Sequence, residues 1–244
     1  MPTGRPWLRE ELLDVLRLYC LTPFGRLHSR NPEVVSLAGK LGRTAASVAY
    51  KLVNFASLDP TIDRKGMSNT SALDRTVWAE FSRDPGVIAE RLEGTAALAF
   101  QEAPQAEYSF EGREGRDTVG MSKRRVNQSF FRSMILASYE SKCAMTGVSD
   151  QRLLVASHID PWAQNTARRL DPHNGLCLNY LHDRAFENGL IAVAPDLSIL
   201  YSSRLPSADL TKLRSISQPK LMLPSRFKPD MVLLERHRTS RFEA

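Results

Sequence analysis

A segment near the middle of the chain cannot supply much of a hydrophobic core, and this limits how the rest can fold. Residues 101–122 hold Pro104, three glycines and seven charged residues but few aliphatic ones. Such a composition is typical of a linker between domains. We therefore predict one domain over residues 1–100, a linker over 101–122 and a second domain over 123–244. Each of the two domains is long enough to bury a core.

The residues before the linker show helical patterns. Apolar side chains recur at helical spacing in five stretches, which cover residues 7–19, 32–41, 44–55, 73–81 and 87–100. Pro32 suits the first turn of the second stretch, Gly42 marks its end, and Thr44 can cap the third. We expect an all-helical N-terminal domain.

The third of these predicted helices has two unlike faces. One face is polar and carries Tyr50, Lys51 and Asn54. The opposite face is an apolar stripe of Val48, Leu52 and Phe55. Two helices, a turn with glycine and a helix with a polar outer face are the layout of a helix-turn-helix module, which can enter the major groove of DNA. Residues 41–48 are also similar to the turn of Myb/SANT-like domains, so we predict that the polar face contacts DNA. A helical bundle for protein contact is the alternative.

Strand patterns follow the linker. The predicted elements are an apolar helix over 130–139, strands at 153–156 and 175–179, a helix over 180–188, a hairpin over 190–201 and a basic helical tail. Gly189 ends the short helix, and Ala194-Pro195-Asp196 forms the turn of the hairpin. The fold class is therefore predicted as α+β, with an all-helical part followed by a mixed one.

Three blocks of residues accompany the strands and the short helix. Residues 156–162 read Ala-Ser-His-Ile-Asp-Pro-Trp, residues 174–178 read Asn-Gly-Leu-Cys-Leu, and residues 181–191 read Leu-His-Asp-Arg-Ala-Phe-Glu-Asn-Gly-Leu-Ile. In this order they resemble the HNH endonuclease superfamily with its ββα-metal fold, in the branch found in bacterial restriction endonucleases. Residues 143–147, Cys-Ala-Met-Thr-Gly, fit the start of that domain, and the resemblance covers roughly residues 125–202.

The resemblance implies hydrolysis of a phosphodiester, which needs a water nucleophile, a base and a cation. His158 is the expected base, because an imidazole can accept a proton near neutral pH. Asn174 is expected to tie down the loop after His158 and to orient the base. Its amide can donate to one backbone group and accept from another.

Two residues of the short helix compete for the role of metal ligand. The third letter of the motif falls on His182, eight residues after Asn174, and we assign it to catalysis and metal binding. Many relatives place this ligand nine residues after the Asn, which is Asp183, with Glu187 one turn later. Both His182 and Asp183 are therefore candidate ligands. Ser157 stands where many relatives carry another ligand, so fewer protein ligands are implied. Mg²⁺ tolerates this because it keeps several waters, and we expect Mg²⁺ or Mn²⁺ as the cofactor.

The chain as a whole suits a polyanionic partner. Its formal net charge is +6, and Arg168 and Arg169 are predicted to reach the phosphate backbone of DNA. No stretch has the length and apolarity of a membrane-spanning helix, and the first residues do not read as a secretory signal. The three cysteines lack Cys-x-x-Cys spacing. We expect a cytoplasmic protein that binds double-stranded DNA and no membrane.

These interpretations combine into one functional hypothesis. The chain is predicted to be a metal-dependent DNA endonuclease of the restriction type, whose helical module engages duplex DNA. Because two strands need two cuts, we expect a homodimer or sequential nicking. The alternatives are a DNA-binding protein with an inactive HNH domain, and a homing or packaging nuclease with the same site.

Overall fold

The computed structural model describes residues 5–62, 69–89, 119–161 and 165–244. The helices before residue 90 are α1 (Arg9–Leu21), α2 (Pro32–Leu41), α3 (Ala45–Leu58), α4 (Ala72–Arg83) and α5 (Gly86–Ala89). The later elements are α6 (Val119–Ser138), β1 (Leu154–His158), β2 (Gly175–Asn179), α7 (Tyr180–Glu187), β3 (Ile191–Val193), β4 (Ile199–Tyr201), α8 (Ser207–Ile216) and α9 (Met231–Ser240). This mixture agrees with the predicted α+β class. Within these described ranges, no helix is long and apolar enough to cross a membrane.

Local signals set the ends of the first helices as predicted. Pro32 occupies the first turn of α2, and the Asn31 side chain caps that helix by accepting a backbone hydrogen bond. Gly42 ends α2 with φ +60°, in the left-handed region that favours glycine. The Thr44 side chain caps α3 in the same way as Asn31 caps α2. These ends depend on residues within one turn, so the sequence pattern is sufficient to locate them.

The end of the last N-terminal helix and the start of the linker fall outside the described residues, and the end of the linker differs from the structure. The helix expected over residues 87–100 begins as α5, but residues 90–118 lie outside the described ranges. Most of the predicted linker lies there as well. Helix α6 already begins at Val119, inside the stretch assigned to the linker, and runs to Ser138.

The C-terminal part is built on two small antiparallel sheets. Strand β1 pairs with β2 so that Ser157 lies opposite Leu176 and His158 lies opposite Gly175. Helix α7 follows β2 directly and packs against both strands, which gives the order strand, strand, helix. Strands β3 and β4 form the predicted hairpin, and α9 packs against β3.

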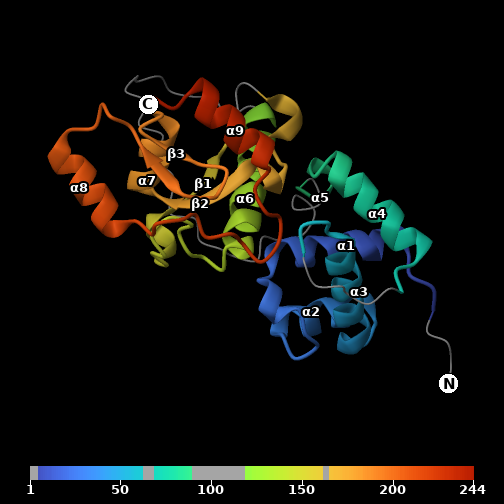
Figure 1. Cartoon of the computed structure of the whole chain (residues 1–244). Coiled ribbons are helices and arrows are strands. Elements are labelled where there is room, and N and C mark those ends of the chain that lie inside the picture. The colour runs from blue at the N-terminus through green and yellow to red at the C-terminus, as the bar shows by residue number, and fades with distance from the viewer. Residues whose placement is uncertain (1–4, 63–68, 90–118, 162–164) are drawn as a thin grey trace.

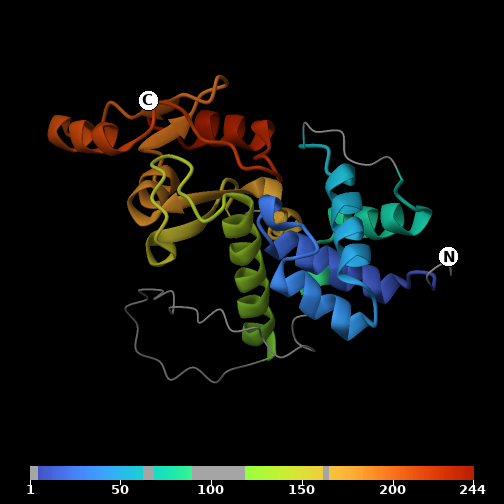
Figure 2. The ribbon, with the colours of Figure 1, turned by 90° about the horizontal axis from the view of Figure 1, so that it is seen from below.

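Helix α6 lies between the N-terminal helices and the strands. It contacts α1 and α5 on one side and β1 and β2 on the other, and Figures 1 and 2 show this central place from two directions. The C-terminal segment also reaches the N-terminal helices, because the ring of Phe227 packs against the rings of Tyr19, Trp78 and Phe81. Buried side chains of the two predicted domains therefore form a continuous hydrophobic cluster.

Candidate active site

His158 is the last residue of β1, and its ring lies against helix α6. The ring stacks on Phe131 with 4.0 Å between the ring centroids and an angle of 11° between the planes. On β2 the opposite position is Gly175, which has no side chain to obstruct the imidazole. The ring of His158 is therefore held against a flat apolar surface.

One nitrogen of His158 is bound to the backbone of the following loop. Its Nε2 atom lies 2.9 Å from the carbonyl oxygen of Arg169. A carbonyl can only accept, so Nε2 must carry the hydrogen, and in the neutral ring the lone pair is then on Nδ1. Burial lowers the pKa of His158, and the hydrogen bond to Arg169 raises it by a smaller amount. The imidazole is therefore neutral near pH 7, which is the form that can accept a proton.

The amide of Asn174 closes the loop that follows His158. This side chain is fully buried, and its Oδ1 accepts a hydrogen bond from the backbone N–H of Asp160 at 2.8 Å. Its Nδ2 donates to the carbonyl oxygens of Asp160 and Arg168, both at 3.1 Å. Arg168 precedes the residue whose carbonyl holds His158, so Asn174 fixes the backbone next to that carbonyl.

Gly175, which follows Asn174, is required by packing rather than by a turn. Its φ of −131° is extended, and the short 3-10 turn Pro172–Asn174 ends before it. A Cβ atom at this position would lie 2.4 Å from Cδ1 of Ile135 and 2.8 Å from Cζ of Phe131. Helix α6 can therefore approach β2, and bring Phe131 against His158, only because residue 175 has no side chain.

His182 lies at the start of α7 and points into the protein. Its side chain is fully buried, with Nδ1 3.0 Å from Oδ1 of Asn179 and Nε2 2.8 Å from Oγ of Ser217. Burial lowers its pKa. Both ring nitrogens are thus occupied by contacts within the chain, and a metal ion could reach one only if a hydrogen bond were broken.

Asp183, the next residue, turns toward β1 instead. Its half-buried carboxylate interacts with the side chain of Ser157, the residue before His158. Burial raises the pKa of Asp183, the Ser157 side chain lowers it, and the charge of Glu187 raises it. Glu187 itself is exposed and pairs with Arg184 at 2.6 Å. A partly desolvated carboxylate therefore lies beside the residue that precedes His158 in β1.

A metal ion at this point would find few protein ligands. Among the residues that the structure describes, no group of three or more His, Cys, Asp or Glu side chains is arranged to hold a metal. The oxygen atoms of Asp183 and Ser157 are candidate donors that α7 and β1 bring together. One carboxylate and a hydroxyl suit a hard cation that keeps its waters, since Mg²⁺ is commonly held by one or two carboxylates together with substrate phosphates.

The two arginines of the loop are not both available for a phosphate. The guanidinium of Arg168 is engaged by Asp171 and by Asp230, each at 2.8 Å. Arg169 is half-buried, and the contact that it makes to His158 comes from its backbone. No pattern of side chains can reveal a backbone carbonyl, so the sequence does not mark this partner of His158.

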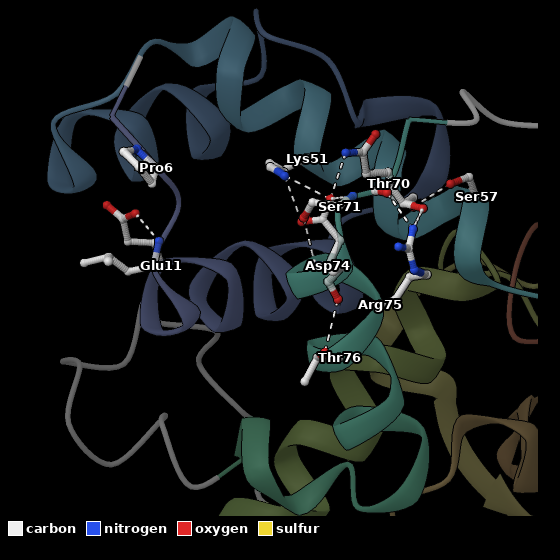
Figure 3. A network of polar contacts seen from close by, with 12 residues as sticks. Pro6, Glu11, Lys51, Ser57, Thr70, Ser71, Asp74, Arg75 and Thr76 are labelled. Carbon is white, nitrogen blue, oxygen red and sulfur yellow. Dashed lines mark hydrogen bonds and ion pairs between the residues drawn. The ribbon is translucent and has the colours of Figure 1, made fainter. Parts of the chain in front are cut away.

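The expected polar outer face of α3 is not found, and this prediction needs correction. Lys51 and Asn54 are 8% and 0% exposed, because both bind the buried carboxylate of Asp74 on α4. Figure 3 shows Lys51 directed at Asp74. Asp74 also accepts the backbone N–H of Ser71, the N-cap residue of α4, and so completes a capping box. The polar atoms of this face form a helix–helix contact, and among the three residues of α3 predicted to contact DNA, Tyr50 is the exposed one, at 37%.

Residues 143–194 match the model of a protein family described as HNH endonuclease. The matched segment contains β1, the loop closed by Asn174, β2, α7 and β3, so the resemblance to the HNH superfamily is confirmed there. No curated protein matches the chain. The match ends short of the N-terminal helices and of the C-terminal segment, and it does not extend to the predicted Myb-like turn.

Proposed function

We propose that this protein is a metal-dependent endonuclease that hydrolyses phosphodiester bonds of DNA, with His158 as the general base. One observation carries the proposal: the ring of His158 is bound through Nε2 to the carbonyl of Arg169, at the end of a strand inside the HNH segment. This contact leaves the lone pair on Nδ1 of the neutral ring. A water molecule beside Nδ1 can give up its proton there while its oxygen attacks phosphorus and the P–O bond to the leaving oxygen breaks.

Asp183 is the residue that we propose as the metal ligand, with Ser157 beside it. Its carboxylate interacts with Ser157, the residue before the proposed base, whereas the nitrogens of His182 are engaged by Asn179 and Ser217. A bound divalent cation, Mg²⁺ or Mn²⁺, would supply charge to stabilise the phosphate in the transition state. Because burial raises the pKa of Asp183, a cation there would also relieve an unfavourable desolvated charge.

Asn174 acts on the base indirectly in this proposal. It binds the backbone of Asp160 and Arg168, and so it holds the loop whose next carbonyl orients His158. Loss of such an orienting residue commonly lowers activity by roughly 10- to 100-fold.

Duplex DNA in a restriction setting is the substrate that we propose, in line with the net charge of +6. Cleavage of both strands requires either a homodimer or two successive nicks. The rival is a DNA-binding protein whose HNH domain is inactive, and the lack of a three-residue ligand group among the described residues favours that reading. A homing or packaging nuclease has the same chemistry, and only its biological setting differs.

Cleavage of plasmid DNA with Mg²⁺ or Mn²⁺ tests the proposal. We expect His158→Ala to lower the rate by roughly 100-fold or more, since a general base contributes about 10²–10⁴-fold. His28→Ala is the matched control, because His28 is exposed on the loop between α1 and α2 and should leave the rate unchanged. If wild type and His158→Ala are equally inert on both unmodified and cytosine-modified DNA, the protein is not a nuclease.

The choice between Asp183 and His182 is tested by metal binding without DNA. We expect Asp183→Asn to weaken Mn²⁺ binding in calorimetry by tenfold or more, a magnitude on the order of that seen when metal sites are disturbed. Glu187→Gln, an exposed carboxylate one turn away, is the control. Weaker binding in His182→Gln, together with unchanged binding in Asp183→Asn, would assign the metal to His182.

A further inference from the structure

The C-terminal segment holds the loop of the candidate active site from outside the HNH match. The backbone N–H of Asp230 donates to the carbonyl of His173 at 2.9 Å, and Nδ1 of His173 lies 2.8 Å from the carbonyl of Lys228. Two ion pairs add to these contacts: Asp230 binds Arg168 at 2.8 Å, and Arg236 binds Asp160 at 2.9 Å. Both ends of the loop are therefore attached to residues 228–236.

Arg168 connects this segment to the base. Its guanidinium binds Asp230, its carbonyl accepts from Asn174, and the carbonyl of the next residue, Arg169, holds Nε2 of His158. A single peptide unit thus separates the residue that Asp230 binds from the carbonyl that orients the imidazole. Movement of the Arg168 side chain would be transmitted directly to that carbonyl.

The segment itself takes its position from the N-terminal helices. Arg226 is fully buried, and its guanidinium donates to the carbonyls of Tyr19 and Cys20 at the end of α1. The next two backbone N–H groups donate to the side chains of Asp59 and Thr61, which follow α3, each at 3.3 Å. Asp230 is therefore placed by a segment that is anchored in the helical part of the chain.

The two carboxylate oxygens of Asp230 have separate tasks. Oδ1 caps α9 by accepting the backbone N–H of Val232 at 2.9 Å, and Oδ2 accepts from Arg168 at 2.8 Å. An asparagine can still cap a helix, but it cannot form the ion pair. The effect of the ion pair on the loop can therefore be separated from the stability of α9.

We propose that Asp230 is a positioning residue, which acts through Arg168 to fix the Arg169 carbonyl and thereby the ring of His158. This inference rests on the proposed role of His158 as the base. It adds a residue that lies 36 positions beyond the end of the HNH match and comes from a different part of the fold. It also makes the N-terminal helices part of the support of the active site, since they anchor Asp230.

The tautomer of the His158 ring, measured by ¹⁵N NMR near pH 8, tests the proposal in the full chain. Wild type is expected to show the Nε2–H form, with the signal assigned by its loss in His158→Ala. Asp230→Asn should add a clear population of the Nδ1–H form, because the carbonyl that selects Nε2–H is no longer held. Asp150→Asn is the matched control: Asp150 also caps a short helix and pairs with its own arginine, Arg152, before β1 begins.

Cleavage kinetics provide the second readout. We expect Asp230→Asn to lower kcat by roughly tenfold with KM within about twofold, as for loss of an orienting contact. Arg168→Met removes the same ion pair from the other side, so it decides the question if Asp230→Asn does not fold. If the tautomer in a folded variant is that of wild type, the positioning role is refuted. If the wild type cleaves no DNA, the proposed function fails, and the NMR result still decides whether Asp230 orients the ring.

Discussion

Replacement of Gly175 by alanine tests the close packing on which the site depends. The added Cβ would lie 2.4 Å from Cδ1 and 2.9 Å from Cγ1 of Ile135, and 2.8 Å from Cζ of Phe131. Carbon atoms in contact prefer about 3.5–4.0 Å, so the overlap is on the order of 1 Å with two side chains that are already buried. Forcing an extra methyl into a packed core costs roughly 1–3 kcal/mol.

The backbone does not add to this cost. Gly175 has an extended φ of −131°, which alanine adopts without strain. Alanine in a strand is itself favoured over glycine by roughly 0.5–1 kcal/mol. The net of the two effects is a decrease of about 1 kcal/mol in the free energy of unfolding of Gly175→Ala, measured by urea denaturation. Because Phe131 stacks on His158, cleavage should fall as well.

Gly39→Ala is the matched control, since nothing lies within 4 Å of its added Cβ and the residue is inside helix α2. That variant should be more stable than wild type by about 0.5–1 kcal/mol. Ile135→Val removes the nearest atom and alone should cost about 1 kcal/mol. The double variant Gly175→Ala, Ile135→Val should therefore be more stable than the sum of the single effects by about 1 kcal/mol. Equal stability of Gly175→Ala and wild type, or strict additivity, would refute this account.

Three further outcomes follow from buried charges. Lys51→Met should lower the free energy of unfolding by about 3 kcal/mol because it leaves the buried charge of Asp74 without its ion pair, whereas Arg184→Met at an exposed pair should change it by less than about 0.5 kcal/mol. Burial lowers the pKa of His237 from 6.5 to about 4, so the unfolded chain binds a proton at higher pH than the folded chain does. As the pH falls from 6.5 to 4, the free energy of unfolding of wild type should fall by about 3 kcal/mol relative to that of His237→Gln, measured by urea denaturation at each pH. Burial would raise the pKa of Glu11, but hydrogen bonds from two arginines and a backbone N–H lower it from 4.5 to about 2. The ionised Glu11 carboxylate contributes its full stabilisation above pH 4.5. The difference in free energy of unfolding between wild type and Glu11→Gln should therefore shrink as the pH falls from 4.5 to 2, and a constant difference would contradict the lowered pKa of Glu11.

The position of the candidate base could be predicted from the sequence. His158 follows a strand pattern, and Asn174 precedes a second one, so pairing of the two strands brings the residues together. Their order and spacing also carry the HNH resemblance, which the family match confirms over residues 143–194. Such features depend on local backbone and on one antiparallel pairing.

The direction of the α7 side chains could not be read from spacing alone. His182 and Asp183 are adjacent, so a rotation of about 100° decides which of them faces β1. The structure turns Asp183 to Ser157 and buries His182 against Ser217, a residue 35 positions later. The partner that occupies His182 is far away in the sequence and leaves no local signal.

Local sequence is sufficient to locate the helix ends at Pro32, Gly42 and Thr44 and to give the order of the two strands with their His and Asn. Each of these follows from backbone preferences or periodicity within a few residues. Which polar groups are buried, and which residues hold His158, depends on the tertiary contacts. Lys51 is covered because Asp74 of another helix binds it, and the carbonyl that holds His158 is tied to Asp230 through Arg168. These choices depend on contacts between distant segments, and a local pattern carries no information about such contacts.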